Sequence, residues 1–315
     1  MTYTNLVNVK DISHLEWLEY RQVGIGGSDA AAACGLSPWK SQAQLYFEKT
    51  TPIKMTEDNE RMRQGRDFED YVAKRFTEET GKKIRRNNFM MRDKEYPFLL
   101  ADIDREVVGE NAILECKTTS PFNKSQWENG QIPLQYELQC HHYMMVTGAE
   151  RCYIACLIFS TDFFYRVIER DEEVIEMLRE REIDFWRNYV EKEVIPAPDG
   201  SVAYDDALKA RFKGENEQSI ALNLKENDFK DYMDRKALIK DLEALNRKYE
   251  QEIKLQIGDN LAGENEFLSV TWKPAIRKSI DTKRIKKERP EIFEEYSKET
   301  EYRTLRIKEK EIIND

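Results

Sequence analysis

A glutamate and a lysine stand two residues apart in the otherwise apolar segment ILECKTTS, residues 113–120. In a β-strand, side chains at positions i and i+2 point to the same face, so Glu115 and Lys117 would lie side by side. Burying either charge alone is costly. Together, a carboxylate and an ammonium group could hold a metal ion and orient a water molecule for phosphodiester hydrolysis.

A second acidic pair lies in the strand-like segment that precedes this one. Asp102 and Asp104 are also two residues apart, and the turn GEN at 109–111 predicts a hairpin that brings one of them opposite Glu115. Carboxylate oxygens are the ligands that Mg²⁺ prefers. An ordinary surface ion pair on an edge strand remains an alternative at this point, because the pattern D-x(10)-E-x-K is short and loosely spaced.

Helices and strands must alternate around these residues. The apolar periodicity predicts helices over residues 11–22, 37–50, 58–80, 133–148 and 171–193. β-branched and aromatic runs predict strands over residues 83–93, 98–108, 112–120, 151–160 and 163–170. This order favours an α/β fold with a central mixed sheet and helices on both of its faces.

A rigid, loop-like stretch, IPAPDGS at 195–201, divides the chain into a domain of residues 1–198 and an extension of residues 199–315. The extension is expected to contain a long helix over 227–257, followed by a strand, a basic turn, a helix and a final strand. The apolar stripe of the long helix is typical of a hairpin or bundle seam rather than of a catalytic surface.

Composition excludes several classes of protein. The 315 residues carry a net charge of −10, whereas proteins that coat DNA without specificity are usually basic. An enzyme that meets DNA at one local site is still compatible with this charge. No apolar run is long enough to span a membrane and no signal peptide is recognisable, so a cytoplasmic protein without a membrane partner is expected. The five cysteines form no CxxC pair, which disfavours zinc ribbons, disulfide frameworks and iron–sulfur clusters.

Four motifs occur in a characteristic order: RQVGIGGSDAAAACGLSPWKSQAQLYFEK, QGRDFEDYVAKRF, LLADIDREVVGENAILECKTTS and LQCHHYMMVTG. Together they resemble the YqaJ-type viral recombinase family, which is related to phage lambda exonuclease within the PD-(D/E)xK nuclease superfamily. The resemblance covers about residues 10–195. It implies a PD-(D/E)xK nuclease core, to which the helical and hairpin extension is added.

The resemblance also implies which residues form the site. The family's A-x-x-D-G matches ADIDR, which favours Asp104 over Asp102 as a metal ligand and puts Arg105 where the family has glycine. The family's E-x-K falls on Glu115 and Lys117. Asp104 and Glu115 would thus bind the metal, and Lys117 would position the attacking water.

Three further positions carry over from the same family. The glutamate of an upstream helix, in the pattern G-x-x-x-E, falls on Glu69 and would be another metal ligand. The backbone carbonyl of Cys116, the middle residue of E-x-K, would supply one more oxygen. The helix glutamine falls on Gln139 and would orient Lys117 or the water. The implied cofactor is Mg²⁺, one or two ions, and Mn²⁺ is expected to substitute.

The segment GIGGSDAAAACG predicts a glycine turn followed by a helix that begins near Ser28. A helix N-terminus is a good place for an anion, and Arg21 could add a bidentate charge to the same phosphate. In lambda exonuclease, an arginine and a serine seven residues apart hold the terminal 5′-phosphate, and Arg21 and Ser28 have that spacing. Ser28 could also be a plain N-cap.

The expected function is a Mg²⁺-dependent 5′-to-3′ exonuclease that acts on double-stranded DNA ends and produces 3′ single-stranded tails for phage-type homologous recombination. Such a product implies a partner that anneals single strands, and the family resemblance makes a homo-oligomeric ring trimer plausible. Two alternatives stay open: a structure-specific or restriction-type endonuclease, and a DNA-end-binding protein without catalysis. A requirement for a 5′-phosphate separates the exonuclease from the endonuclease.

Overall fold

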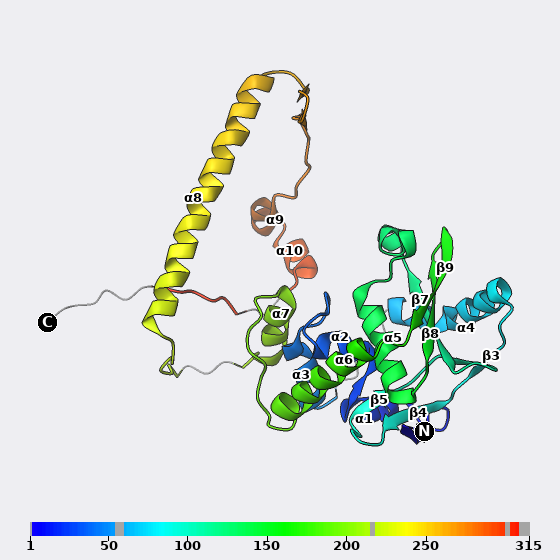
Figure 1. Cartoon of the computed structure of the whole chain (residues 1–315). Helices are drawn as coiled ribbons and strands as arrows, with labels where there is room; N and C mark the ends of the chain where they lie inside the picture. The colour runs from blue at the N-terminus through cyan, green and yellow to red at the C-terminus, as the bar shows by residue number, and fades with distance from the viewer. Residues whose placement is uncertain (1, 54–59, 215–217, 300–302, 309–315) are drawn as a thin grey trace. The chain divides into compact units, whose positions relative to one another are not determined.

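The computed structural model describes residues 2–53, 60–214, 218–299 and 303–308, and Figure 1 shows the course of the chain. It contains two compact units, Met1–Lys213 and Gly214–Asp315. The first unit extends past the boundary expected at residue 198, because helix α7 (Val202–Arg211) packs against α3 (Gln42–Thr50). Tyr204 of α7 is buried and donates a hydrogen bond to the carbonyl oxygen of Pro196 at 2.8 Å.

The first unit is built on two sheets. One has the strand order β1-β4-β5-β2, with β1 Tyr3–Asn8, β4 Phe89–Asp93, β5 Leu99–Ala101 and β2 Ile25–Gly26. The other has the order β3-β6-β7-β8-β9, with β3 Ile84–Arg86, β6 Arg105–Val107, β7 Ala112–Thr119, β8 Arg151–Ile158 and β9 Asp162–Glu169. Strands β7 and β8 are parallel and the other pairs of this sheet are antiparallel, so the expected mixed sheet is confirmed.

Helices cover both faces of the five-stranded sheet. The remaining helices of the unit are α1 His14–Gln22, α2 Gly27–Ala33, α4 Glu60–Thr80, α5 Leu134–Thr147 and α6 Glu172–Phe185, with short helical turns at Pro121–Gln126, Glu128–Gly130 and Trp186–Val190. Leu114 of β7 packs in a cluster with residues of α4, and Ile113 packs in the cluster that contains α5. The alternation expected along this strand is therefore present.

Local signals in the sequence explain several helix ends. Ser13 caps α1 in a reciprocal capping box with Glu16. Helix α5 stops at Gly148, whose φ of 76° is a left-handed conformation that glycine adopts without strain. The helix expected from residue 58 begins at Glu60 in the structure, and residues 58 and 59 lie outside the described part of the chain.

Two strand predictions are wrong, because the chain passes between the two sheets. Residues 83–93 form β3 of the five-stranded sheet and β4 of the four-stranded sheet rather than one strand. Residues 98–108 do not form a single strand, because β5 belongs to the first sheet and β6 to the second. Asp102, Ile103 and Asp104 form the crossing between the two sheets. Ile103 is buried in the core, whereas each aspartate accepts a hydrogen bond, from the indole of Trp17 and the backbone amide of Cys116, respectively. The crossing thus places two carboxylates at the point where the sheets meet.

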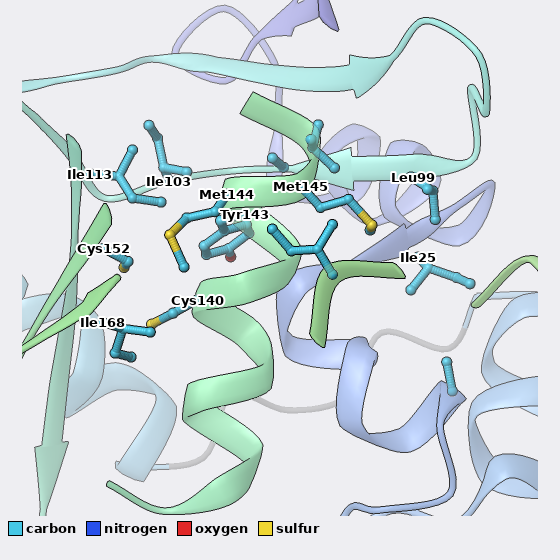
Figure 2. Packing of buried hydrophobic residues seen from close by; sticks show 14 of the residues in the cluster. Ile25, Leu99, Ile103, Ile113, Cys140, Tyr143, Met144, Met145, Cys152 and Ile168 are labelled. Carbon is cyan, nitrogen blue, oxygen red and sulfur yellow. The ribbon is translucent and has the colours of Figure 1, made fainter. Parts of the chain in front are cut away.

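The main core lies around α5. Figure 2 shows Tyr143, Met144 and Met145 of this helix beside Ile103 of the crossing and beside residues of the surrounding strands, namely Ile25, Leu99, Ile113, Cys152 and Ile168. Burial of apolar area on this scale is the main favourable contribution to folding. A helix packed on both sheets can hold polar side chains rigidly against β7.

The second unit contains α8 Glu226–Ile257, the hairpin β10 Ala262–Glu264 and β11 Ser269–Thr271, α9 Thr282–Glu288 and α10 Pro290–Tyr296. The long helix and the hairpin agree with the expected extension. The final strand expected near the C-terminus is wrong for residues 303–308, which form no strand. No helix in the described ranges is long and apolar enough to cross a membrane.

Candidate active site

The pairing of β6 with β7 decides which aspartate lies beside Glu115. Arg105 pairs with Leu114 in this antiparallel register, so the next pair along would be Asp104 and Glu115. The backbone N–H of Cys116 donates to Oδ2 of Asp104 at 2.7 Å. Asp102 instead accepts from Nε1 of Trp17 at 2.9 Å. This geometry supports the prediction that Asp104, and not Asp102, is a metal ligand.

A tight polar network connects β7 to α5. Oε1 of Glu115 accepts from Nζ of Lys117 at 2.6 Å and from Nε2 of Gln139 at 2.6 Å. Nζ of Lys117 also donates to Oε1 of Gln139 at 3.0 Å, and Nε2 of Gln139 donates to the hydroxyl of Tyr143 at 3.2 Å. The sequence-predicted residues Glu115, Lys117 and Gln139 therefore lie together, and each holds the other two in place.

The second carboxylate oxygen of Glu115, unlike the first, takes no part in this network. The residue is only 4% exposed, and its Oε2 is buried without a hydrogen-bond partner among the described residues. An unsatisfied buried oxygen costs about 1–3 kcal/mol, and more when it is charged. A carboxylate oxygen left in this state next to Asp104 is suited to receive a cation.

The directions in which the pKa values of these groups are shifted support the same interpretation. Burial raises the pKa of Asp104 well above its usual range, and the charges of Glu115 and Glu69 raise it further. Burial also raises the pKa of Glu115, although Lys117 partly offsets this. For Lys117, burial alone would lower the pKa, but Glu115 and Asp104 raise it well above the ordinary value. The two carboxylates thus favour the ammonium form of Lys117, which can orient a water or a phosphate.

These donors fit a hard divalent cation. Mg²⁺ takes oxygen ligands and keeps several waters, so two carboxylates are enough to hold it. No cluster of three or more histidine, cysteine, aspartate or glutamate side chains with metal-binding geometry occurs in the part of the chain that the structure describes. Asp104 and Glu115 are side chains that could hold the metal, and the Cys116 carbonyl remains a predicted additional ligand.

Glu69 is placed near the site but is already engaged. It lies on α4, and its charge raises the pKa of both Asp104 and Glu115. Its Oε1 accepts from Nη1 of Arg105 at 2.5 Å. The sequence contained no signal for this ion pair, because the two residues are 36 positions apart and only the packing of α4 on the sheet brings them together.

Arg21 and Ser28 also come together. Nη2 of Arg21 donates to Oγ of Ser28 and to Oδ2 of Asp29, both at 2.9 Å. The expectation that Ser28 caps its helix is wrong: the N-cap of α2 is Gly26, whose backbone N–H donates to the Asp29 carboxylate at 3.3 Å. The Ser28 hydroxyl is exposed and so can reach a ligand.

Two lysines that no sequence pattern singled out join this group. Lys49 donates to Oδ2 of Asp29 at 2.9 Å, and Nζ of Lys40 lies 3.6 Å from Oδ1. Burial would raise the pKa of Asp29, but Arg21, Lys49 and Lys40 hold it well below its usual range. Three cations around one carboxylate leave an excess of positive charge beside Ser28, although Lys40 also pairs with Glu48.

Gly27 brings this basic group next to the polar network. A Cβ atom at Gly27 would come within 2.5 Å of the ring of Tyr143 and 3.0 Å of the side chain of Gln139. Only glycine therefore allows α2 to approach α5 this closely. The two groups of charges consequently flank the same stretch of α5.

Comparison with known proteins shows which family this chain is similar to. Residues 16–150 match the YqaJ-like viral recombinase domain. The uncharacterized protein YqaJ of Bacillus subtilis (strain 168) is 40% identical over 309 residues, which cover 96% of this chain and 97% of that protein. The chain belongs to the YqaJ-like viral recombinase family. The family resemblance expected from the four motifs is thus confirmed, and the matched range includes every predicted site residue from Arg21 to Gln139.

Solved structures give weaker likenesses. The alkaline exonuclease LHK-Exo of Laribacter hongkongensis aligns with a TM-score of 0.49 and 21% identity, over 57% of this chain and 94% of that one. A phage-related exonuclease of Haemophilus somnus 129PT aligns with a TM-score of 0.42 and 15% identity, over 54% of this chain and 95% of that one. The similarity to YqaJ, by contrast, extends over both units of this recombinase-family chain.

Proposed function

We propose that the protein is a metal-dependent deoxyribonuclease that degrades one strand of duplex DNA from a 5′ end, in the 5′-to-3′ direction. The observation that carries the proposal is the buried, unpartnered Oε2 of Glu115, next to Asp104 and the fixed ammonium group of Lys117. A balanced ion pair in a structural role would leave no such oxygen. Membership of a viral recombinase family makes DNA the natural substrate.

The site residues would have different roles in hydrolysis. Asp104 and Glu115 would hold Mg²⁺, or Mn²⁺ in its place, which supplies charge neutralisation at the phosphate and a more acidic bound water. The Lys117 ammonium stabilises negative charge that develops at the phosphate. Gln139 fixes the geometry, because its amide contacts both Glu115 and Lys117.

The second group of charges supports the proposed 5′-to-3′ polarity. Arg21 and Ser28, supported by Lys40 and Lys49, would bind the terminal 5′-phosphate through charge-assisted hydrogen bonds. Because α2 packs directly on α5, a phosphate held there lies beside the hydrolytic residues. The product would be a 3′ single-stranded tail for homologous recombination. A single-strand annealing protein is the corresponding proposed partner, a ring trimer the proposed assembly, and the cytoplasm the proposed location.

One digestion experiment tests the proposal. Linear duplex DNA labelled at a 5′-phosphate is incubated with the purified full-length chain, with and without Mg²⁺, beside covalently closed circular duplex. The expected result is Mg²⁺-dependent release of label from the linear DNA and no cutting of the circle. Efficient cutting of closed circles without any 5′-phosphate preference would establish an endonuclease instead. End binding without Mg²⁺-dependent product would establish the non-catalytic alternative.

A further inference from the structure

Arg105 occupies an unusual position beside the carboxylates. It begins β6, and its side chain is only 5% exposed. Nη1 donates to Oε1 of Glu69 and to the backbone carbonyl of Asp104, both at 2.5 Å, while Nη2 donates to Asp70. A guanidinium group is planar and presents its donors in a fixed fork. Three acceptors on two of its nitrogens therefore fix the orientation of this cation.

Glu69 is correspondingly restrained. The oxygen that accepts from Arg105 also lies 3.8 Å from Nη2 of Arg86, so two arginines face one carboxylate. Hydrogen bonds between ionised partners are among the strongest in proteins. A metal ion that recruited this Oε1 would have to displace a buried guanidinium, and one bound through the other oxygen would lie close to the same cation, which is unfavourable. Glu115, by contrast, offers a free buried oxygen.

The charges around the site lead to a definite stoichiometry. Glu69, Asp102, Asp104 and Glu115 contribute four negative charges, and Lys117 and Arg105 contribute two positive ones. Asp70 and Arg86 pair with each other and cancel. Two negative charges remain in the chain without DNA. A single divalent ion neutralises them. A second ion would leave a large positive excess at short range in a partly buried site, which is unfavourable.

We propose that Arg105 keeps Glu69 from coordinating the metal, so that the site binds one divalent cation between Asp104 and Glu115. Arg105 is then a positioning residue that takes the place of a second metal ion. The inference rests on the proposed function for the biological role of the metal. Its test needs neither DNA nor turnover, so the inference and the proposed function can fail separately.

The test is a titration of the full-length chain with Mn²⁺, in which electron paramagnetic resonance reports the free ion. The wild type should bind one Mn²⁺ per chain. Glu69→Gln keeps a hydrogen-bond acceptor for Arg105 and should retain one ion with its Kd changed by no more than about threefold. Glu115→Gln removes a ligand charge and should weaken binding at least about tenfold, because a metal ligand must be deprotonated.

Removal of the guanidinium should have the opposite effect. Arg105→Gln frees Glu69, and a second Mn²⁺ per chain is expected. Arg85→Gln is the matched control, since Arg85 lies on the neighbouring strand β3, pairs with Glu106 and is 72% exposed. Circular dichroism spectra check that each variant is folded. If Arg105→Gln does not fold, the comparison of Glu69→Gln with Glu115→Gln still decides the question.

Three outcomes would overturn the inference: two Mn²⁺ ions per wild-type chain, a loss of affinity in Glu69→Gln as large as in Glu115→Gln, or a folded Arg105→Gln chain that binds one ion with unchanged Kd. A wild-type chain that binds one Mn²⁺ but digests no DNA would disprove the proposed function and leave the stoichiometry intact. Digestion of DNA by a chain that binds two ions would support the proposed function and disprove the one-metal stoichiometry.

Discussion

Two groups of charged side chains in the first unit differ in the sign of the charge that they leave uncompensated. The acidic cluster consists of Glu69, Asp104 and Glu115 with Lys117 and Arg105. The basic cluster consists of Arg21, Lys40 and Lys49 with Asp29. The first has an excess of negative charge and the second an excess of positive charge. A buried group that its own protein leaves unbalanced is suited to a ligand of opposite sign.

A third buried group shows what a balanced pair looks like. His142 of α5 and Glu182 of α6 are fully buried, and Nδ1 of the imidazole lies 2.9 Å from both carboxylate oxygens. Nε2 lies 2.8 Å from the carbonyl oxygen of Leu100. When the imidazole is protonated, one positive charge meets one negative charge, and each polar atom has a partner. The pair accordingly needs no ligand, and it serves as an internal reference for the two clusters.

The comparison between the acidic and the basic cluster is tested most directly at the acidic cluster. Glu115→Gln keeps the shape of the side chain but removes the charge that faces the proposed metal. Digestion of linear 5′-phosphorylated duplex should slow by at least ~100-fold, the scale of losing one electrostatic contact to a transition state. Initial rates at saturating Mg²⁺ measure this effect.

Asp102→Asn is the matched control for that variant. Asp102 lies on the same crossing between the sheets but accepts a hydrogen bond from Trp17, which asparagine can preserve. Its rate should stay close to that of the wild type. A reversed result, with Asp102 essential and Asp104→Asn active, would show that the wrong aspartate has been assigned to the metal.

Replacement of Lys117 tests whether this residue acts in the hydrolysis step without contributing to metal binding. Lys117→Ala should lower the digestion rate about 100-fold because a cation near the phosphate is lost. Its Kd for Mn²⁺ should not increase, since removing a positive charge leaves the site more negative. If the affinity for Mn²⁺ instead falls as far as in Glu115→Gln, Lys117 is a structural partner of the carboxylates.

The acidic cluster was largely predictable, because its key relations are short-range. The shared face of Glu115 and Lys117 follows from the two-residue repeat of a strand. The turn at 109–111 predicted that Asp102 or Asp104 lies opposite Glu115. The choice of Asp104 came from the family resemblance, and the register of β6 with β7 agrees with it. Gln139 needed the family resemblance, since nothing in the local pattern shows that α5 packs against β7.

The parts that could not be predicted depend on contacts between distant segments. The pairing of Arg105 with Glu69, and of Lys49 with Asp29, arises only when separate helices pack. The break in the strand at Asp102–Asp104 arises because the chain passes between two sheets, and propensity carries no information on that. The N-cap of α2 is Gly26 rather than Ser28, because the carboxylate of Asp29 accepts a hydrogen bond from the backbone N–H of Gly26.

The basic cluster gives a smaller expected effect. Charge-assisted hydrogen bonds to a phosphate contribute about 1.5–3 kcal/mol, which corresponds to a roughly ten- to hundredfold preference for 5′-phosphorylated over 5′-hydroxyl ends. Arg21→Ala should abolish this preference by slowing only the phosphorylated substrate. The fold should survive, since Asp29 keeps Lys49 and Lys40 as partners.

Rates on the two kinds of end, measured in competition, test this prediction. Arg85→Ala removes an arginine that is 72% exposed and distant in sequence from the basic cluster, and it should keep the preference. Equal slowing of both substrates by Arg21→Ala would mean that Arg21 has a general role in folding or DNA binding rather than a role in recognising the terminal phosphate.

The balanced pair should affect activity least and depend on pH in a defined direction. A carbonyl and a carboxylate both accept, so both ring nitrogens of His142 carry protons and the imidazole is positively charged. Burial alone would lower the pKa of His142, but Glu182 and the hydrogen bonds raise it above the usual value. The stabilisation is therefore fully present below about pH 6.5 and is lost as the pH rises through the folded-state value.

His142→Gln isolates this contribution. Removing one partner of a buried ion pair costs about 3–5 kcal/mol, so the Tm should fall markedly at pH 6, and the difference in Tm from the wild type should shrink towards pH 9. Thermal unfolding followed by circular dichroism measures both. Below its Tm, the variant should keep one Mn²⁺ per chain and the preference for 5′-phosphorylated ends. A constant Tm difference across this pH range would show a neutral histidine, and loss of metal binding in the folded variant would show that the pair belongs to the acidic cluster after all.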